Sequence, residues 1–141
     1  MYVRENSTNI EIMTEPITYT GGCHCGAVRY QIQVEKLEAV DCNCSICSKK
    51  GFIHLIVPAS RFTLLQGADA LSTYTFNTGI AKHHFCHHCG IHAFYRPRSH
   101  PEGYDVNLRC LDENAIEQFQ ITPFDGQHWE EQIKQIQGKY S

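Results

Sequence analysis

The chain has 141 residues, eight of them cysteine, with a formal net charge of -3 and a pI of about 6.3. This length suits a single domain, and the charge provides no overall basic field that would attract nucleic acid or an anionic membrane. The sequence has no apolar run of about 18 residues and no apolar signal-peptide core near its start, so we expect a cytoplasmic protein without a membrane or nucleic-acid partner.

The predicted elements are mostly short strands. Residues 1–14 are polar and patternless, and we predict a flexible tail there. The segment AVRYQIQV, residues 27–34, alternates apolar and polar side chains, which is typical of a half-buried strand. Segments rich in β-branched and aromatic residues predict further strands at 37–40, 52–57, 62–67, 71–76, 81–85, 91–95 and 104–108.

Helical signals occur only in the last third of the chain. A turn of helix is predicted over residues 112–119, with Asp112 as its cap. Trp129, Ile133 and Ile136 recur at i, i+4 and i+7, which predicts a short C-terminal helix. Short strands separated by turn residues, with one helical end, predict a single all-β domain over residues 15–138.

Four cysteines form two pairs that are each followed by glycine, CHCG and CHHCG. A tight turn aims both thiolates of a pair at one ion, and the glycine lets the chain turn back past them. Two such pairs complete a tetrahedron, which predicts a closed structural site of Cys23, Cys25, Cys86 and Cys89. A redox-active or merely buried pair is the alternative, and two glycine-followed pairs in one chain argue against it. The spacings match no ferredoxin pattern, which favours zinc over an iron–sulfur cluster.

A third cluster, in DCNCSICSKKG, contains only three cysteines: Cys42, Cys44 and Cys47. Zinc sites with three protein ligands and an exchangeable fourth position are the catalytic kind. Three thiolates make the ion electron-rich, so it should favour a soft fourth ligand such as the thiolate of a substrate. The sequence therefore predicts sulfur chemistry at this cluster.

Several neighbours could complete or serve the open site. Cys110 could be its fourth ligand, although its place after an apolar strand favours a buried free thiol. His54 could line the site or be a structural strand histidine. Lys49 and Lys50 could hold an anionic substrate, or they could belong to a solvated turn.

Three segments, GGCHCGAVRY, CNCSICSKKG and HFCHHCGIHAFY, resemble the glutathione-dependent formaldehyde-activating enzyme family, also called the centromere protein V/Gfa domain. IVPASRF, YTFNT, FYRPRS, RCLD and FDGQHWE resemble its centromere protein V branch most. The resemblance implies an Mss4-like fold of several short coiled β-sheets around two zinc ions. It implies the same partition of cysteines into a structural and a catalytic site. The reaction it implies is condensation of formaldehyde with glutathione, which is classed with the carbon–sulfur lyases.

Two function classes follow from these observations. In the first, the protein is an enzyme in which zinc lowers the pKa of a bound thiol such as glutathione, and the thiolate adds to a small aldehyde such as formaldehyde. In the second, it is a non-catalytic, zinc-stabilised binding module of the centromere protein V type. A DNA-binding zinc module is disfavoured by the acidic charge and by the acidic run over residues 112–131.

Overall fold

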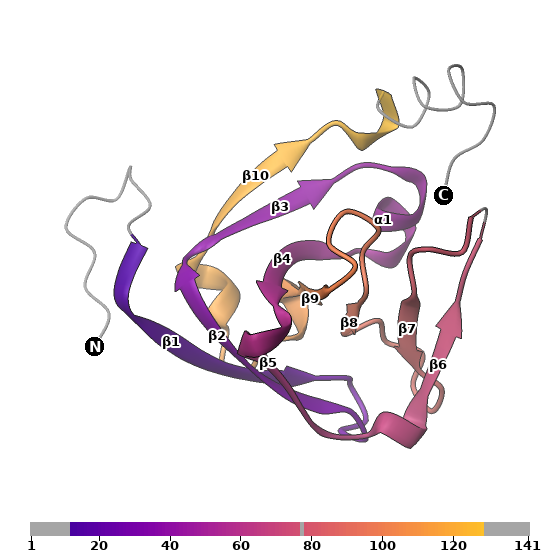
Figure 1. Ribbon diagram of the computed structural model, residues 1–141, viewed down its shortest axis with the longest axis horizontal. Coiled ribbons are helices and arrows are strands. Elements are labelled where there is room, and N and C mark those ends of the chain that lie inside the picture. The colour runs from indigo at the N-terminus through magenta and orange to yellow at the C-terminus, as the bar shows by residue number, and fades with distance from the viewer. Residues whose placement is uncertain (1–11, 77, 129–141) are drawn as a thin grey trace.

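The computed structural model describes residues 12–76 and 78–128. In this part of the chain, ten strands form three sheets, joined by one α-helix and four 3-10 helices (Figure 1). The strands are β1 (Ile12–Gly22), β2 (Arg29–Lys36), β3 (Glu38–Cys42), β4 (Ile53–Pro58), β5 (Phe62–Gln66), β6 (Leu71–Tyr74), β7 (His83–Cys86), β8 (Phe94–Tyr95), β9 (Gly103–Asn107) and β10 (Gln120–Phe124). The helices are α1 (Ser45–Lys50) and the 3-10 turns η1 (Ala59–Arg61), η2 (Ala68–Ala70), η3 (Leu108–Cys110) and η4 (Ala115–Gln118).

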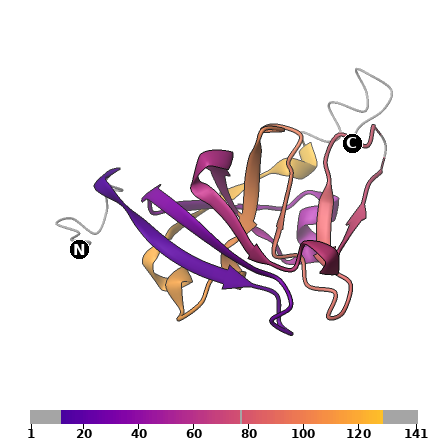
Figure 2. The same ribbon diagram turned by 60° about the horizontal axis from the view of Figure 1, so that its bottom comes forward.

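The three-stranded sheet has the order β1-β2-β5, and all its pairings are antiparallel. Figure 2 shows its long β1–β2 hairpin in front of the other elements. On β2 and just before it, Val28, Tyr30, Ile32 and Val34 are buried, whereas the residues between them are not. The alternation predicted for residues 27–34 is confirmed, because one face of the strand packs on the core.

The five-stranded sheet has the order β10-β3-β4-β9-β8, in which β10 runs parallel to β3 and the other pairs are antiparallel. Within this sheet, the adjacent strands β3, β4 and β9 bring residues from distant parts of the chain into register. Val40 pairs with His54, and His54 pairs with Asn107. This sheet therefore sets side chains of β4 and β9 beside the cysteines at the end of β3.

Aromatic side chains fill the space between the two larger sheets. Tyr30, which is fully buried, stacks on Phe62 with ring centroids 5.5 Å apart and meets Phe94 edge-on at 6.0 Å. Tyr104 of β9 stacks on the other side of this group, 4.1 Å from Phe62. These contacts join one sheet to the other.

The all-β class predicted from the sequence is confirmed, and the boundaries of several elements differ from expectation. Strand β1 begins at Ile12, inside the span predicted as a tail, and β10 and α1 were not predicted. The strand predicted over residues 91–95 is reduced to β8, Phe94–Tyr95. No helix of the described residues is long and apolar enough to cross a membrane.

The predicted helix over 112–119 is wrong in extent, and Asp112 is not its cap. Only η4 is helical there, and Asn114 precedes it as the capping residue. Asp112 instead accepts hydrogen bonds from Arg29 of β2 and from Thr20 of β1. A charged partner in another element thus outweighs the local capping preference. The C-terminal helix predicted from Trp129 onward lies outside the described residues.

Gly67, between β5 and η2, is placed where no side chain fits. Its φ is +99°, and a Cβ would lie 2.4 Å from the carbonyl oxygen of Ala27. We expect Gly67→Ala to lower the free energy of unfolding by roughly 2–4 kcal/mol, because backbone strain and overlap add. Urea denaturation measures the change. Gly79→Ala is the control: its φ is +72° but nothing lies within 4 Å of the new Cβ. An equal loss of unfolding free energy in both variants would rule out the overlap with Ala27 as a cause.

Candidate functional site

Four cysteines from two turns converge into one cluster. Cys23 and Cys25 lie in the turn after β1, while Cys86 ends β7 and Cys89 lies in the turn that follows. Their sulfurs all lie within 4.8 Å of one another, and the Cys23–Cys25 and Cys25–Cys86 distances are 3.6 and 3.7 Å. A zinc–sulfur bond of 2.3 Å gives a tetrahedron with edges of about 3.8 Å. The cluster therefore has the dimensions of a four-thiolate zinc site.

The backbone around this cluster favours thiolates. The amide of Val28 donates to Cys23 Sγ over 3.3 Å. Burial raises the pKa of Cys89, but hydrogen bonds from the backbone at Cys25 and Ile91 and from neighbouring thiols outweigh it and bring the pKa to about 6. Amides aimed at sulfur stabilise the charged form that a metal requires.

The second cluster contains three cysteines at one end of the five-stranded sheet. Cys42 ends β3, Cys44 caps α1, and Cys47 lies inside α1; their sulfurs also lie within 4.8 Å of one another. Cys44 and Cys47 are each only 6% exposed. Hydrogen bonding with Cys42 and Cys44, together with burial, raises the pKa of Cys47. Two buried thiols and the half-buried thiol of Cys42 can all ionise at this separation only with a cation among them.

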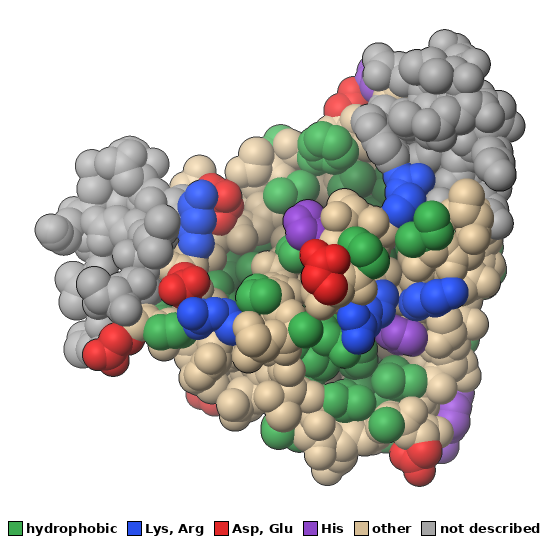
Figure 3. Space-filling view, in the orientation of Figure 1, with side chains coloured by type: hydrophobic (Ala, Val, Ile, Leu, Met, Phe, Trp, Pro, Cys, Tyr) green, Lys and Arg blue, Asp and Glu red, His purple; other side chains and the backbone are tan. Residues whose placement is uncertain are grey.

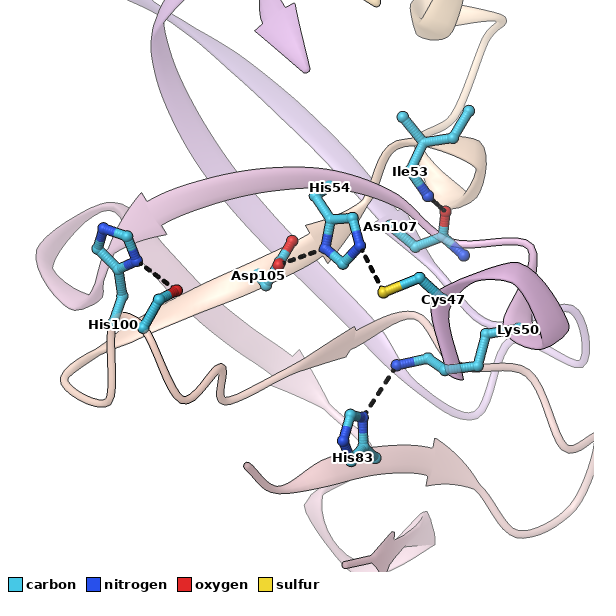
Figure 4. Close-up of polar contacts among 9 residues, drawn as sticks. Cys47, Lys50, Ile53, His54, His83, His100, Asp105 and Asn107 are labelled. Carbon is cyan, nitrogen blue, oxygen red and sulfur yellow. Dashed lines mark hydrogen bonds and ion pairs between the residues drawn. The ribbon is translucent and has the colours of Figure 1, made fainter. Parts of the chain in front are cut away.

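His54 lies between Asp105 and Cys47 of this three-cysteine cluster (Figure 4). His54 Nε2 is 3.0 Å from Cys47 Sγ, and His54 Nδ1 is 2.5 Å from Asp105 Oδ2. His54 comes from β4 and Asp105 from the adjacent β9. Neither nitrogen of His54 belongs to the mutually close group of three sulfurs, so the histidine contacts the cluster from one side.

Asp105 was not singled out in the sequence. It is 2% exposed, and its Oδ1 is buried without a hydrogen-bond partner among the described residues. The pKa of the neighbouring Tyr95 phenol is raised, mainly by burial of Tyr95 and next by the charge of Asp105, so the phenol stays neutral. The sequence pattern that could have identified Asp105 is that Asp105 and Asn107 are polar residues on one face of an apolar strand.

A cavity of about 600 Å³ opens onto the three-cysteine cluster. Cys42, Cys44, Cys47, His54 and Asp105 line it together with an apolar wall, which includes Ile56, Phe76, Tyr95 and Phe124. Arg98 and His100 of the loop after β8 also line the cavity. On the face drawn in Figure 3, hydrophobic and basic side chains lie side by side. The cavity thus combines thiols with apolar surface and a cation.

The other predicted site residues lie apart from this cavity lining. Lys49, Lys50 and Cys110 line a second cavity of about 750 Å³, beside the four-cysteine cluster. Cys110 Sγ is 4.0 Å from the carbonyl oxygen of His92, and Cys110 belongs to neither thiol cluster. Burial, with the charges of Cys23 and Cys89, raises the pKa of Cys110 to about 11. Cys110 is thus a free thiol that is half-buried, whereas its sequence context favours a buried one.

Fold and site together define a small all-β domain with two thiol clusters that could each hold a metal ion, one of them at a cavity. The chain belongs to the glutathione-dependent formaldehyde-activating enzyme family, whose model matches residues 18–131. It is also similar to the crystal structure of a protein from Rhodobacter sphaeroides, with 35% sequence identity and a TM-score of 0.67. That likeness covers 74% of this chain and 99% of the other.

Proposed function

We propose that the protein is a zinc-dependent enzyme of the carbon–sulfur lyase type, which adds a glutathione-like thiol to a small aldehyde such as formaldehyde. Family membership supports this chemistry. The observation that carries it is the three-cysteine cluster in the wall of the cavity, with no fourth cysteine in the close group among the described residues. Three protein ligands at an open cavity are the pattern of a metal that binds substrate.

The proposal assigns two zinc ions to the chain. Cys23, Cys25, Cys86 and Cys89 would hold the structural ion, and Cys42, Cys44 and Cys47 would hold the catalytic one. The sulfur–sulfur distances of the first cluster and the donor chemistry of both suit zinc. A reducing compartment such as the cytoplasm would keep all seven thiols available as ligands.

The residues around the second cluster would supply the rest of the mechanism. Cys42, Cys44 and Cys47 would hold the zinc ion, which would supply the positive charge that lowers the pKa of a substrate thiol bound at the cluster. His54 Nε2, which lies at the edge of the cluster, would accept the proton of that thiol. Asp105 holds the histidine by Nδ1 and would stabilise the imidazolium that forms. The apolar wall would limit water around the aldehyde, and Arg98 lies where it could meet a carboxylate of the thiol substrate.

The reaction is tested by exchange spectroscopy. Zinc-loaded protein should speed the exchange between free formaldehyde and its glutathione adduct, measured by NMR. Cys44→Ala should abolish this acceleration and lower the zinc content from two ions per chain to one, because it removes a ligand of the open site only. Cys110→Ala, which removes a thiol outside both clusters, should keep both the acceleration and two ions.

The opposite result would favour a different role. If the zinc-loaded wild-type protein gives no acceleration with glutathione, the glutathione reaction is wrong. The motifs shared with the centromere protein V branch would then favour a zinc-stabilised binding module. We assign the chain to that branch as part of the proposal, on the segments IVPASRF, FYRPRS and FDGQHWE.

A further inference from the structure

Lys50 has surroundings that are unusual for a lysine. It ends helix α1, and its Nζ lies 4.4 Å from the ring centroid of Phe52 and 4.1 Å from that of Tyr95. The same nitrogen is 3.2 Å from His83 Nδ1. None of the ion pairs in the described part of the chain includes Lys50. Lys50 is half-buried, and its amine lies against aromatic rings without a carboxylate in contact among the described residues.

Desolvation makes the neutral amine of Lys50 more available than that of an ordinary lysine. Burial lowers the pKa of Lys50 to about 8, although the charges of Cys47, Asp105 and Cys44 act in the opposite direction. Burial and the charge of Lys50 lower the pKa of His83 to about 4, so His83 is neutral and can accept a hydrogen bond at Nδ1. A desolvated lysine beside another basic group is the setting in which lysine acts as a nucleophile toward carbonyl carbon.

Lys50 lines the second cavity, and the side chains that contact its amine reach the cavity of the three-cysteine cluster. Tyr95 and His83, two of its three contacts, line that cavity. Phe52, the third, has its ring centroid 4.9 Å from that of His54, which contacts Cys47. Figure 4 shows Lys50 and Cys47 extending from the same helix toward this region. The rings of Phe52 and Tyr95 therefore contact the amine and also lie next to His54.

We propose that Lys50 is a catalytic residue that captures the aldehyde covalently before the thiol receives it. This inference rests on the proposed thiol–aldehyde reaction and adds a step to it. The substrate class is a small unhindered aldehyde, because two rings and the imidazole of His83 crowd the amine and leave room only for a molecule of a few atoms.

The step balances without any further reactant. The lone pair of the neutral Lys50 amine forms a C–N bond to the aldehyde carbon, the C=O π bond breaks, and a proton moves from nitrogen to oxygen to give a carbinolamine. The proton released by the thiol substrate then protonates the carbinolamine nitrogen. The thiolate forms a C–S bond as the C–N bond breaks, and the electron pair returns to nitrogen. The products are the S-hydroxymethyl thiol and the neutral amine of Lys50.

Reductive trapping tests the capture on the wild-type, zinc-loaded protein. Limiting formaldehyde with cyanoborohydride converts a captured aldehyde into N-methyl-lysine, and peptide mass spectrometry gives the rate for each lysine. At neutral pH, Lys50 should be methylated about tenfold faster than Lys49, because a lowered pKa leaves far more of an amine unprotonated. Lys49 is the matched control, since it is the exposed neighbour on the same helix. Methylation of Lys50 no faster than that of Lys49 would overturn the inference.

A substitution separates covalent capture from a charge effect. Lys50→Arg keeps the positive charge and the contacts with the rings but cannot form the carbinolamine. It should bind two zinc ions and lose the enzyme-dependent exchange of formaldehyde with glutathione. Full exchange in Lys50→Arg would contradict the proposal and leave the glutathione reaction intact. Selective trapping at Lys50 without any glutathione exchange in the wild type would support the capture and reject glutathione as the acceptor.

Discussion

Replacing Cys86 by serine is expected to leave the chain largely unfolded at room temperature. Cys86 is 1% exposed and belongs to the cluster that joins the turn after β1 to the turn after β7. Structural zinc sites contribute roughly 10–16 kcal/mol to folding, whereas the net stability of a domain is only about 5–15 kcal/mol. If the cluster holds zinc as proposed, loss of one of its four ligands would remove most of the interactions that join these segments. Near-UV circular dichroism and zinc content measure the outcome.

The control for Cys86→Ser is Cys110→Ser. Cys110 is partly buried and packs against the core but belongs to neither cluster. We expect Cys110→Ser to fold, to bind two zinc ions and to lose only about 1 kcal/mol of unfolding free energy. If Cys86→Ser melts at the same temperature as the wild type and keeps two zinc ions, the four-cysteine cluster is not a structural metal site.

The second large effect is expected at the histidine behind the open cluster. His54→Gln should lower kcat/KM for the thiol–aldehyde reaction by about 100-fold, because it removes the group that takes the proton of the thiol. The loss should fall on kcat, since the three cysteines that would hold the metal are unchanged. Steady-state kinetics on protein with a measured zinc content distinguishes this from loss of the ion.

Asp105→Asn should reduce kcat less, by about tenfold, because the amide can still hold His54 but no longer stabilises its charge. The control is His128→Gln, which breaks another histidine–aspartate pair, with Asp125, at an exposed position. That variant should retain wild-type kinetics. Equal losses in His54→Gln and His128→Gln, or a loss of zinc in proportion to activity in His54→Gln, would contradict a role in proton transfer.

The cysteines of each cluster could be predicted from the sequence because two cysteines separated by one or two residues come together in any tight turn. Cys42, Cys44 and Cys47 needed only the local geometry of one strand end and one helical turn to come together. The buried face of β2 followed from its alternation for the same reason. Both features depend on residues that are close in the chain.

The features missed by the sequence depend on pairing between distant segments. Asp105 reaches His54 only because β9 lies beside β4, and one residue of slip would turn it to the other face. Lys50 contacts Tyr95 and His83 because α1 packs against elements more than 30 residues away. Strand β10 has no buried face and contains a proline, so its sequence carries neither the alternation nor the apolar run of a typical strand.

The parallel pairing of β10 with β3 has a consequence for how the protein matures. Phe124 pairs with Cys42, and Gly126 lies so close that a Cβ there would be 2.5 Å from Cys42 Sγ. The ribosome delivers the chain from its N-terminus, so all seven clustered cysteines emerge well before the segment that closes this side of the cavity. The thiols of Cys42, Cys44 and Cys47 are therefore open to solvent on this side until Phe124 and Gly126 add their part of the cavity wall.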